Sequence, residues 1–216
     1  RVKGHEKGSD TVRSIVTVSR EIGIKFLTLY AFSTENWARP DSEVKALMGL
    51  LKKFIVAERK DLQKNNIRLN VIGQKHRLPP DVLHELDAAL ELTKTNEEMV
   101  LNLALSYGSR EEITRAMKKI ADQIAAKDLS PDAITEDLIT ANLYTSGMPD
   151  PDLIIRTSGE YRLSNFLMWQ AAYSEIYITE TLWPDFTKDE FIEILKNYQN
   201  RDRRFGKVSC NTSNGG

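Results

Sequence analysis

Residues 24–32 read IKFLTLYAF, and STENWARP follows directly at residues 33–40. The first nine residues are almost continuously apolar over the length of a typical strand, and polar residues end the run. A continuous run, in place of an alternating one, is typical of a strand buried on both faces in a parallel sheet. The sequence therefore predicts a buried parallel strand with a polar loop at its carboxyl end.

Four further apolar runs predict strands of the same kind, at residues 67–72, 99–105, 153–156 and 176–179. Between them, residues 41–65 carry apolar side chains at a period near 3.6, which predicts a helix. Two more helices are predicted by the capping-box spacing of Ser109 with Glu112 and of Thr187 with Glu190. The alternation predicts an α/β fold: a single domain with a mainly parallel central sheet surrounded by helices.

The composition limits the possible functions. Of the 216 residues, 41% are hydrophobic and 28% charged, as in an ordinary soluble globular domain. The net charge of −1 gives no argument for nucleic acid as a partner. A single cysteine, Cys210, and three scattered histidines argue against a zinc-type site, so a catalytic metal is expected to be Mg²⁺ held by carboxylates and phosphates. No apolar run nears the ~20 residues of a membrane span, and we expect a cytoplasmic protein whose membrane contact, if any, is peripheral.

The loop after the first strand gathers side chains that bind or orient ligands. They are Phe32, Ser33, Asn36, Trp37 and Arg39, with Glu43 on the first turn of the next helix. Ligands of parallel sheets bind beyond the carboxyl ends of the strands, which favours a site here. The alternative is a structural loop in which Trp37 fills the core and the polar side chains cap a helix.

A second polar loop, RTSGEYRLSN at residues 156–165, also follows a strand. Arg156, Arg162 and Ser164 offer groups that suit a diphosphate, and residues 164–165 could open a helix whose amides do the same. The alternative is an exposed loop with a surface ion pair to Glu160. Further along, Glu175 before the last strand is either a metal ligand or a carboxylate that reaches solvent.

Both ends of the chain are basic. RDRRFG at residues 201–206 is either a solvated helix end or part of a phosphate site, and RVKGHEKG at residues 1–8 places His5 among cationic residues. No Walker A loop, G-x-G-x-x-G, G-x-S-x-G or D-D-x-x-D motif occurs in the sequence.

Together these motifs resemble the cis-prenyltransferases of the undecaprenyl diphosphate synthase type. The resemblance is carried by AFSTENWARPDSEV at residues 31–44, SYGSR at 106–110, DLIIRTSGEYRLSNFLMWQ at 152–170, WPDF at 183–186 and RDRRFG at 201–206. It implies a domain over residues 1–206 with a hydrophobic tunnel, a homodimer, and residues 207–216 as a disordered tail. It also implies an Mg²⁺-dependent enzyme that joins isopentenyl diphosphate to an allylic diphosphate such as farnesyl diphosphate. The product would be a long Z-polyprenyl diphosphate such as undecaprenyl diphosphate, a cell-wall precursor.

The resemblance also implies roles for single residues. Asn36 would be catalytic, and Phe32, Ser33, Trp37 and Arg39 would orient the reacting groups. The diphosphate of isopentenyl diphosphate would be held by Arg156, Arg162 and Ser164, with Glu175 on Mg²⁺ and with Arg204 and Gly206 covering the site. Arg1 and His5 would line the allylic site, residues 41–65 with Leu101 and Leu103 the tunnel, and Trp183 and Asp185 would support Glu175 and the dimer.

The family has a strand and an M-D-G-N-x-R-W segment ahead of the part that matches here, and its aspartate is catalytic. We expect an apolar strand with Asp-Gly-Asn and an arginine ahead of Arg1 in the full gene. Two alternatives remain: a non-catalytic subunit of a heteromeric cis-prenyltransferase, against which the intact Asn36, Arg156 and Glu175 argue, and a polyphosphate-binding or phosphotransfer protein of the α/β class.

Overall fold

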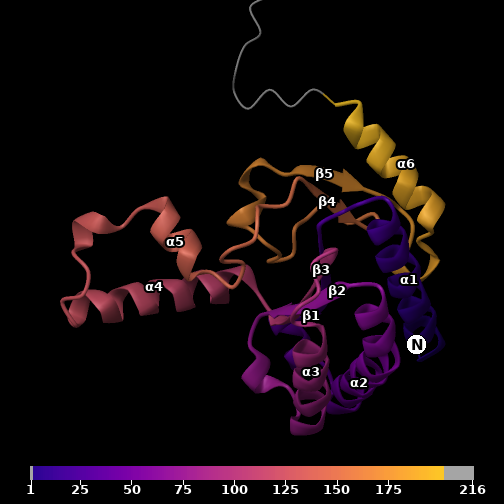
Figure 1. The fold of residues 1–216 in the computed structure, drawn as a ribbon, viewed down its shortest axis with the longest axis horizontal. Coiled ribbons are helices and arrows are strands. Elements are labelled where there is room, and N and C mark those ends of the chain that lie inside the picture. Colours follow the sequence, from indigo (N-terminus) through magenta and orange to yellow (C-terminus); the bar gives the residue numbers. More distant parts are fainter. Residues whose placement is uncertain (1, 202–216) are drawn as a thin grey trace, which may run out of the picture.

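The computed structural model describes the chain over residues 2–201, and the side chains from Lys7 onward (Figure 1). Its strands are β1 (Phe26–Ser33), β2 (Ile67–Ile72), β3 (Met99–Tyr107), β4 (Leu153–Arg156) and β5 (Glu175–Ile178). Its helices are α1 (Val2–Glu21), α2 (Asp41–Lys64), α3 (Pro80–Thr93), α4 (Ser109–Ala125), α5 (Glu136–Asn142) and α6 (Lys188–Gln199). The five predicted strands are all present, each within two residues of its predicted bounds.

The described strands form two parallel sheets. One has the order β1-β3-β2 and the other pairs β4 with β5. β3 lies in the middle of the larger sheet, and all 9 of its residues are buried, which is why it shows no alternation in the sequence. The predicted parallel α/β domain is confirmed, with its strands divided between two sheets.

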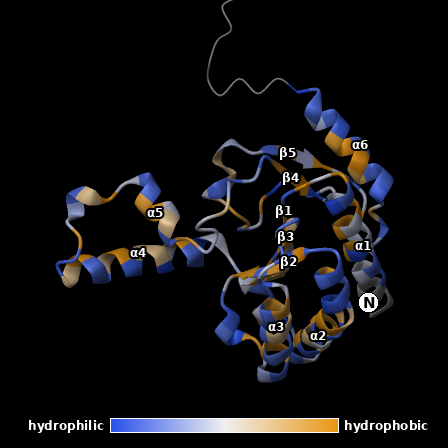
Figure 2. Ribbon diagram, in the orientation of Figure 1, coloured by the Kyte–Doolittle hydropathy of each residue, from blue (hydrophilic) through white to orange (hydrophobic). Residues whose placement is uncertain are grey.

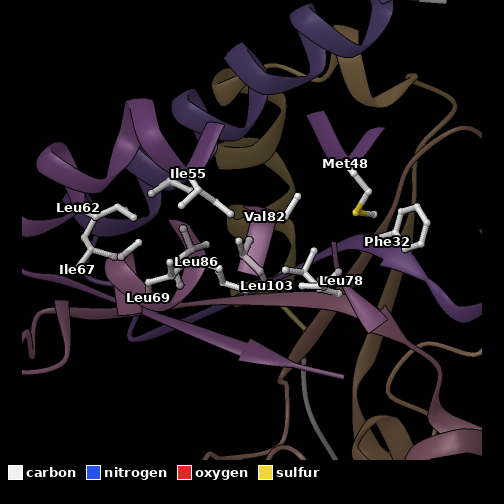
Figure 3. Close-up of a cluster of buried hydrophobic side chains, with 14 of the residues drawn as sticks. Phe32, Met48, Ile55, Leu62, Ile67, Leu69, Leu78, Val82, Leu86 and Leu103 are labelled. Carbon is white, nitrogen blue, oxygen red and sulfur yellow. The ribbon is translucent and has the colours of Figure 1, made fainter. Parts of the chain in front are cut away.

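The main core lies between the larger sheet and the pair α2 and α3 (Figure 3), and hydrophobic residues of α2, α3 and β2 are orange in Figure 2. Ile55 and Leu62 from α2 and Leu86 from α3 pack against Leu69 and Leu103 of the strands. Each side chain buried in this way contributes about 1.5–3 kcal/mol, so α2 is fixed along one wall of the sheet.

A second core joins the smaller sheet to the rest of the molecule. Ile15 and Val18 of α1 and Phe191 and Ile194 of α6 are buried together, and Ile155 of β4 packs against them. No helix was predicted at residues 2–21, although Ile15 and Val18 stand at helical spacing. Within residues 2–201, no helix is long and apolar enough to cross a membrane.

The two predicted capping boxes have different outcomes. Thr187 caps α6 and its side chain accepts a hydrogen bond from the amide of Glu190, as predicted, but the Glu190 carboxylate accepts from Thr179, so only the Thr187 half of the box is present. α4, which extends with α5 away from the sheets (Figure 1), is instead preceded by Gly108 as its N-cap. Ser109 accepts from the amide of Met168, so the box predicted at this helix is wrong.

Candidate active site

A large cleft lies between β1 and β4. Its volume is about 1600 Å³, and its lining includes side chains from α1, β1, α2 and β4. In the described chain, β1 pairs with β3 and β4 pairs with β5, so the edges of β1 and β4 that meet the cleft are unpaired. The α2 wall is apolar and carries Leu47, Met48, Leu50, Leu51 and Phe54. Leu103 also lines the cleft, whereas Leu101 is fully buried in the core and does not.

Polar side chains stand where β1 and β4 end. Asn36 and Arg39 come from the loop after β1, and Arg156 and Arg162 from β4 and the loop after it. All four line the cleft, together with Phe32. The fold therefore brings the two loops that the sequence singled out to one mouth, as the carboxyl ends of parallel strands predict.

The loop after β1 is a short 3-10 helix, Thr34–Ala38. The amide of Ser33 donates to Oδ1 of Asn36 over 3.0 Å. Because this bond occupies the side-chain oxygen of Asn36, its NH₂ group remains the part that can donate to a ligand. Arg39 donates to Oε1 of Glu43 over 2.7 Å, which holds its guanidinium at the mouth.

Trp37 follows the structural alternative. Its indole donates to Oγ of Ser106 over 2.8 Å, and its ring meets Phe32 edge to face with centroids 4.9 Å apart. Arg77 stacks on the indole at 5.0 Å. Trp37 packs against the main core and is not among the residues that line the cleft. It therefore anchors the loop after β1 to the core.

The loop after β4 presents its arginines to the cleft. Nε of Arg156 is buried and has no hydrogen-bond partner among the described residues, so it can donate a hydrogen bond to a ligand. Arg162 pairs with Glu160, which is the surface ion pair of the alternative reading, yet both residues line the cleft. Guanidinium groups in such a place suit a diphosphate.

The backbone of the same loop differs from the prediction. Residues 164–165 do not open a helix, because Ser164 and Asn165 have φ values of 51° and 62°. The amides of Ser158 and Gly159 donate to the carbonyls of Thr181 and Thr179, and so are already used. Ser164 is exposed and is not in the lining of the cleft. Any anion here is therefore bound mainly by side chains.

Two ionisable groups near the mouth have shifted pKa values. Burial, and next the charge of Glu35, raises the pKa of Tyr30 to about 12, so its hydroxyl stays protonated. Burial alone would raise the pKa of Glu35, but hydrogen bonds from Asn165, its own backbone, Ser33 and Thr34 outweigh it and lower that pKa. Glu35 is thus a carboxylate held in place by donors.

Glu175 lies elsewhere. It pairs in register with Leu153, whereas Arg156 pairs with Ile178, so Glu175 begins β5 at the end of the small sheet opposite to the cationic loop. The offset of three residues is roughly 10 Å. Oε2 of Glu175 accepts from Arg201 over 2.7 Å, and Glu175 does not line the cleft.

The described side chains do not fit a resident metal site. From Lys7 to Arg201, no group of three or more His, Cys, Asp or Glu residues is placed to hold an ion. Mg²⁺ usually binds through one or two carboxylates and the phosphates of a substrate, and Glu175 is not beside the cationic loop of its own chain.

Several predicted residues lie outside the description. Arg1, Arg204 and Gly206 are beyond residues 2–201, and the side chain of His5, in α1, is not described. The tail at residues 207–216 lies outside the described residues as well.

Trp183 and Asp185 lie within the described residues, and neither makes a hydrogen bond or an ion pair with Glu175 there. The indole of Trp183 donates to the carbonyl of Gly8 over 3.2 Å, and Asp185 pairs with Lys7. Both therefore fasten α1 to the segment before α6.

Three residues of the site were missed: Glu35, Gly108 and Asn165. The side chain of Asn165 donates to Oε1 of Glu35 over 2.8 Å, and Gly108 leaves room for that contact. Each lies inside a motif of the family resemblance, at residues 31–44, 106–110 and 152–170. Membership of these motifs was the one sign in the sequence that pointed to them. Their partners are set by the tertiary fold.

The chain as a whole is similar to known proteins. A family model described as "Putative undecaprenyl diphosphate synthase" matches residues 1–206. An isoprenyl transferase of Geobacter sulfurreducens is 52% identical over 210 residues, covering 97% of this chain and 85% of that protein. An isoprenyl transferase of Agrobacterium fabrum is 51% identical over 97% of this chain and 85% of its own length.

Solved structures agree. The lavandulyl diphosphate synthase of Lavandula x intermedia, solved with dimethylallyl diphosphate, superposes with a TM-score of 0.92 at 37% identity, covering 95% of this chain and 89% of that one. A "probable undecaprenyl diphosphate synthase" of Campylobacter jejuni gives a TM-score of 0.82 at 40% identity, covering 94% and 93%. These relatives do not support the alternative of a non-catalytic subunit. The chain is a prenyltransferase and belongs to the undecaprenyl diphosphate synthase family of cis-prenyltransferases.

Proposed function

We propose that the protein condenses isopentenyl diphosphate with an allylic diphosphate, farnesyl diphosphate in the first instance, and lengthens it to a Z-polyprenyl diphosphate such as undecaprenyl diphosphate. The observation that carries this proposal is one cleft with a polar mouth and an apolar wall. Asn36, Arg39, Arg156 and Arg162 stand at the mouth, and the side chains of α2 line the wall. A molecule with a diphosphate head and a hydrocarbon tail has a polar part that suits the mouth and an apolar part that suits the wall.

The apolar wall of the cleft suits a long hydrocarbon tail, because Leu47, Leu51 and Phe54 of α2 line it. Apolar area buried along the tail stabilises binding by about 0.8 kcal/mol per CH₂ group. Successive additions of isopentenyl units would push the tail along the α2 wall while the diphosphate stays at the mouth.

In the reaction, the C–O bond of the allylic diphosphate breaks and diphosphate leaves. The double bond of isopentenyl diphosphate attacks the allylic carbon. A proton then passes from C2 of the isopentenyl unit to water or to the released diphosphate, which leaves a new double bond of Z geometry. Arg156 and Arg162 would hold the diphosphate of isopentenyl diphosphate by paired N–H donors, with Ser164 beside them. The NH₂ group of Asn36 and the guanidinium of Arg39 would orient the reacting groups, with Phe32 and Ser33 framing the same loop. Orientation of this kind can lower a barrier by about 7–11 kcal/mol.

We further propose that turnover requires Mg²⁺, that the protein acts as a homodimer, and that its contact with membranes is peripheral. Bound to the diphosphates, Mg²⁺ would supply charge neutralisation. Since Glu175 lies away from the cationic loop of its own chain, we propose it as an Mg²⁺ ligand only in an assembly in which a second chain brings it to a cleft. For Arg1, His5, Trp37, Arg204 and Gly206, the substrate contacts that the family resemblance implies likewise remain proposals.

The unpaired edges of β1 and β4 support the expectation of a further strand. A strand parallel to both would join the two sheets and would satisfy backbone groups that face the cleft. We propose that the apolar strand and Asp-Gly-Asn segment expected ahead of Arg1 fill this position and complete the allylic half of the site. The upstream gene sequence tests this, and a start codon directly before Arg1 would refute it.

The activity is tested by incubating the full-length protein with Mg²⁺, labelled isopentenyl diphosphate and farnesyl diphosphate. We expect the label to pass into a product that extracts into organic solvent, and we expect Arg156→Ala to lower the rate of incorporation strongly. Nucleoside triphosphates serve as the competing substrate class. Phosphate release from nucleotides without any incorporation of label would favour the phosphotransfer alternative.

A further inference from the structure

Asn165 links three segments at the mouth of the cleft. Its Nδ2 donates to Oε1 of Glu35 over 2.8 Å, its Oδ1 accepts from the amide of Arg110 over 2.9 Å, and its carbonyl accepts from the amide of Ser109 over 2.8 Å. These partners belong to the loop after β1 and to the first turn of α4. A single side chain thus ties the loop after β4 to the carboxyl ends of two strands of the other sheet.

The position of these residues in the chain matters. Glu35 directly precedes Asn36, and Asn165 directly follows Ser164. The hydrogen bond between Glu35 and Asn165 therefore joins the loop of the proposed catalytic amide to the loop of the proposed diphosphate ligands.

We propose that Asn165 is a positioning residue, which sets the distance and orientation between the two loops. This inference rests on the proposed function, and it adds a residue that acts through Glu35, Ser109 and Arg110 rather than by contact with substrate.

The backbone around Asn165 supports this role. Ser164 and Asn165 have φ values of 51° and 62°, in the left-handed region that residues other than glycine seldom adopt and in which asparagine is favoured. Such a conformation persists where the surrounding structure holds it, and here the three hydrogen bonds of Asn165 do so. The ring of Phe166 adds a further contact, stacked on Tyr30 with centroids 4.5 Å apart.

The chemistry requires an amide at position 165. Oδ1 accepts a hydrogen bond while Nδ2 donates one to a carboxylate, and a side-chain amide does both from two separate atoms, whereas an ionised carboxylate can only accept. An aspartate would keep the bond from Arg110 but would set a second carboxylate against Glu35. Glu35→Gln would then restore the hydrogen bond in the opposite direction, because the NH₂ group of the glutamine would donate to the aspartate at position 165.

This reciprocal exchange gives the test. We compare the full-length unmodified protein with Asn165→Asp, Glu35→Gln and the double variant, measuring kcat and KM for isopentenyl diphosphate. Misplaced reacting groups can cost on the order of 100-fold, so we expect Asn165→Asp to lose about 10–100-fold in kcat/KM. Glu35→Gln still accepts from Asn165 but loses the second carboxylate oxygen, which accepts from Thr34, so it should lose less than Asn165→Asp. The double variant should regain most of the loss of Asn165→Asp.

The matched control is Asn96→Asp. Nδ2 of Asn96 donates to the carbonyls of Leu62 and Ile67, and Asn96 is buried at the other end of the sheet. Its replacement should lower the urea midpoint of unfolding without changing KM. Hydrogen exchange of residues 33–38 adds a readout that does not need turnover, and exchange there should be faster in Asn165→Asp than in the unmodified protein. The Arg110 amide keeps its acceptor in this variant, so its exchange should not change.

The outcomes separate the two claims. If the unmodified protein turns over isopentenyl diphosphate while the double variant is no better than Asn165→Asp, the positioning role is wrong and the proposed function stands. Unchanged exchange of residues 33–38 in Asn165→Asp also refutes the positioning role. If the unmodified protein shows no turnover, the proposed function fails, and the exchange measurement still decides whether Asn165 holds the two loops.

Discussion

A β-carbon at Gly108 would lie 2.7 Å from Nδ2 of Asn165 and 2.5 Å from Oγ1 of Thr34. Gly108 has an extended backbone with φ of −160°, so space and not conformation requires a glycine. Gly108→Ala should therefore push the two loops apart. We expect a loss of about 1–3 kcal/mol in the free energy of unfolding, as overpacking costs, together with a fall in kcat. Urea unfolding and steady-state kinetics of the same preparations measure both.

The control for this prediction is Gly49→Ala in α2. A β-carbon at Gly49 meets nothing within 4 Å, and alanine is the better helix former. This variant should be neutral or more stable by up to about 1 kcal/mol. A Gly108→Ala protein as stable and active as Gly49→Ala would show that the two loops tolerate a wider spacing.

Glu35 should make stability depend on pH. Its pKa in the folded protein is lowered, so its contribution is present above the unfolded value of about 4.3 and is lost as pH falls through the folded pKa. Asn165→Ala removes one of the donors that lower this pKa. The stability difference between the unmodified protein and Asn165→Ala should therefore shrink as pH is lowered below about 4 in urea titrations. A difference that stays constant across this range would mean that the charge of Glu35 does not matter to the contact.

Arg162 should not be replaceable by lysine. Lysine keeps the charge but lacks the planar pair of donors that matches a diphosphate. We expect Arg162→Lys to raise KM for isopentenyl diphosphate about tenfold, which corresponds to the loss of one charge-assisted hydrogen bond, with a smaller rise in KM for the allylic substrate. Equal rises for both substrates would contradict the assignment of Arg162 to one diphosphate.

Glu175 should couple to Mg²⁺. We expect Glu175→Ala to weaken isopentenyl diphosphate binding when Mg²⁺ is present and to leave it unchanged or slightly tighter with chelator, because a carboxylate beside an anion is unfavourable without a cation between them. Calorimetric titration of the unmodified protein and of Glu175→Ala, each with Mg²⁺ and with chelator, gives the coupling energy between Glu175 and Mg²⁺. An equal loss in the two conditions would mean that Glu175 matters only through its ion pair with Arg201, which is partly exposed and is expected to contribute at most about 1 kcal/mol.

The sequence predicted those parts of the fold that depend on local pattern. β3 was found because all of its residues are buried, and burial on both faces leaves a continuous apolar run. β1 has a run of the same kind, but Phe32 is the one buried residue in it, so the burial predicted for this strand on both faces is wrong. Thr187 was identified as a cap because its partner lies three residues away. The two polar loops were located because parallel strands bring their carboxyl ends together.

What the sequence did not predict depends on tertiary contacts. Ser109 and Glu112 have the spacing of a cap, but Glu112 is fully buried and its carboxylate accepts from the hydroxyl of Tyr107 over 2.6 Å. The place of Glu175 depends on the register of β5 against β4, which no local pattern encodes. Asn165 was missed for the same reason, since Glu35 is 130 residues away along the chain.

The most direct test of the account is the structure of the product. Full-length protein, Mg²⁺, farnesyl diphosphate and isotopically labelled isopentenyl diphosphate are incubated together, and the product is analysed by mass spectrometry and by NMR of its double bonds. We expect a series of polyprenyl diphosphates longer than the primer by whole isopentenyl units, with each new double bond in the Z configuration. New double bonds in the E configuration, or a folded protein that adds no unit, would contradict it.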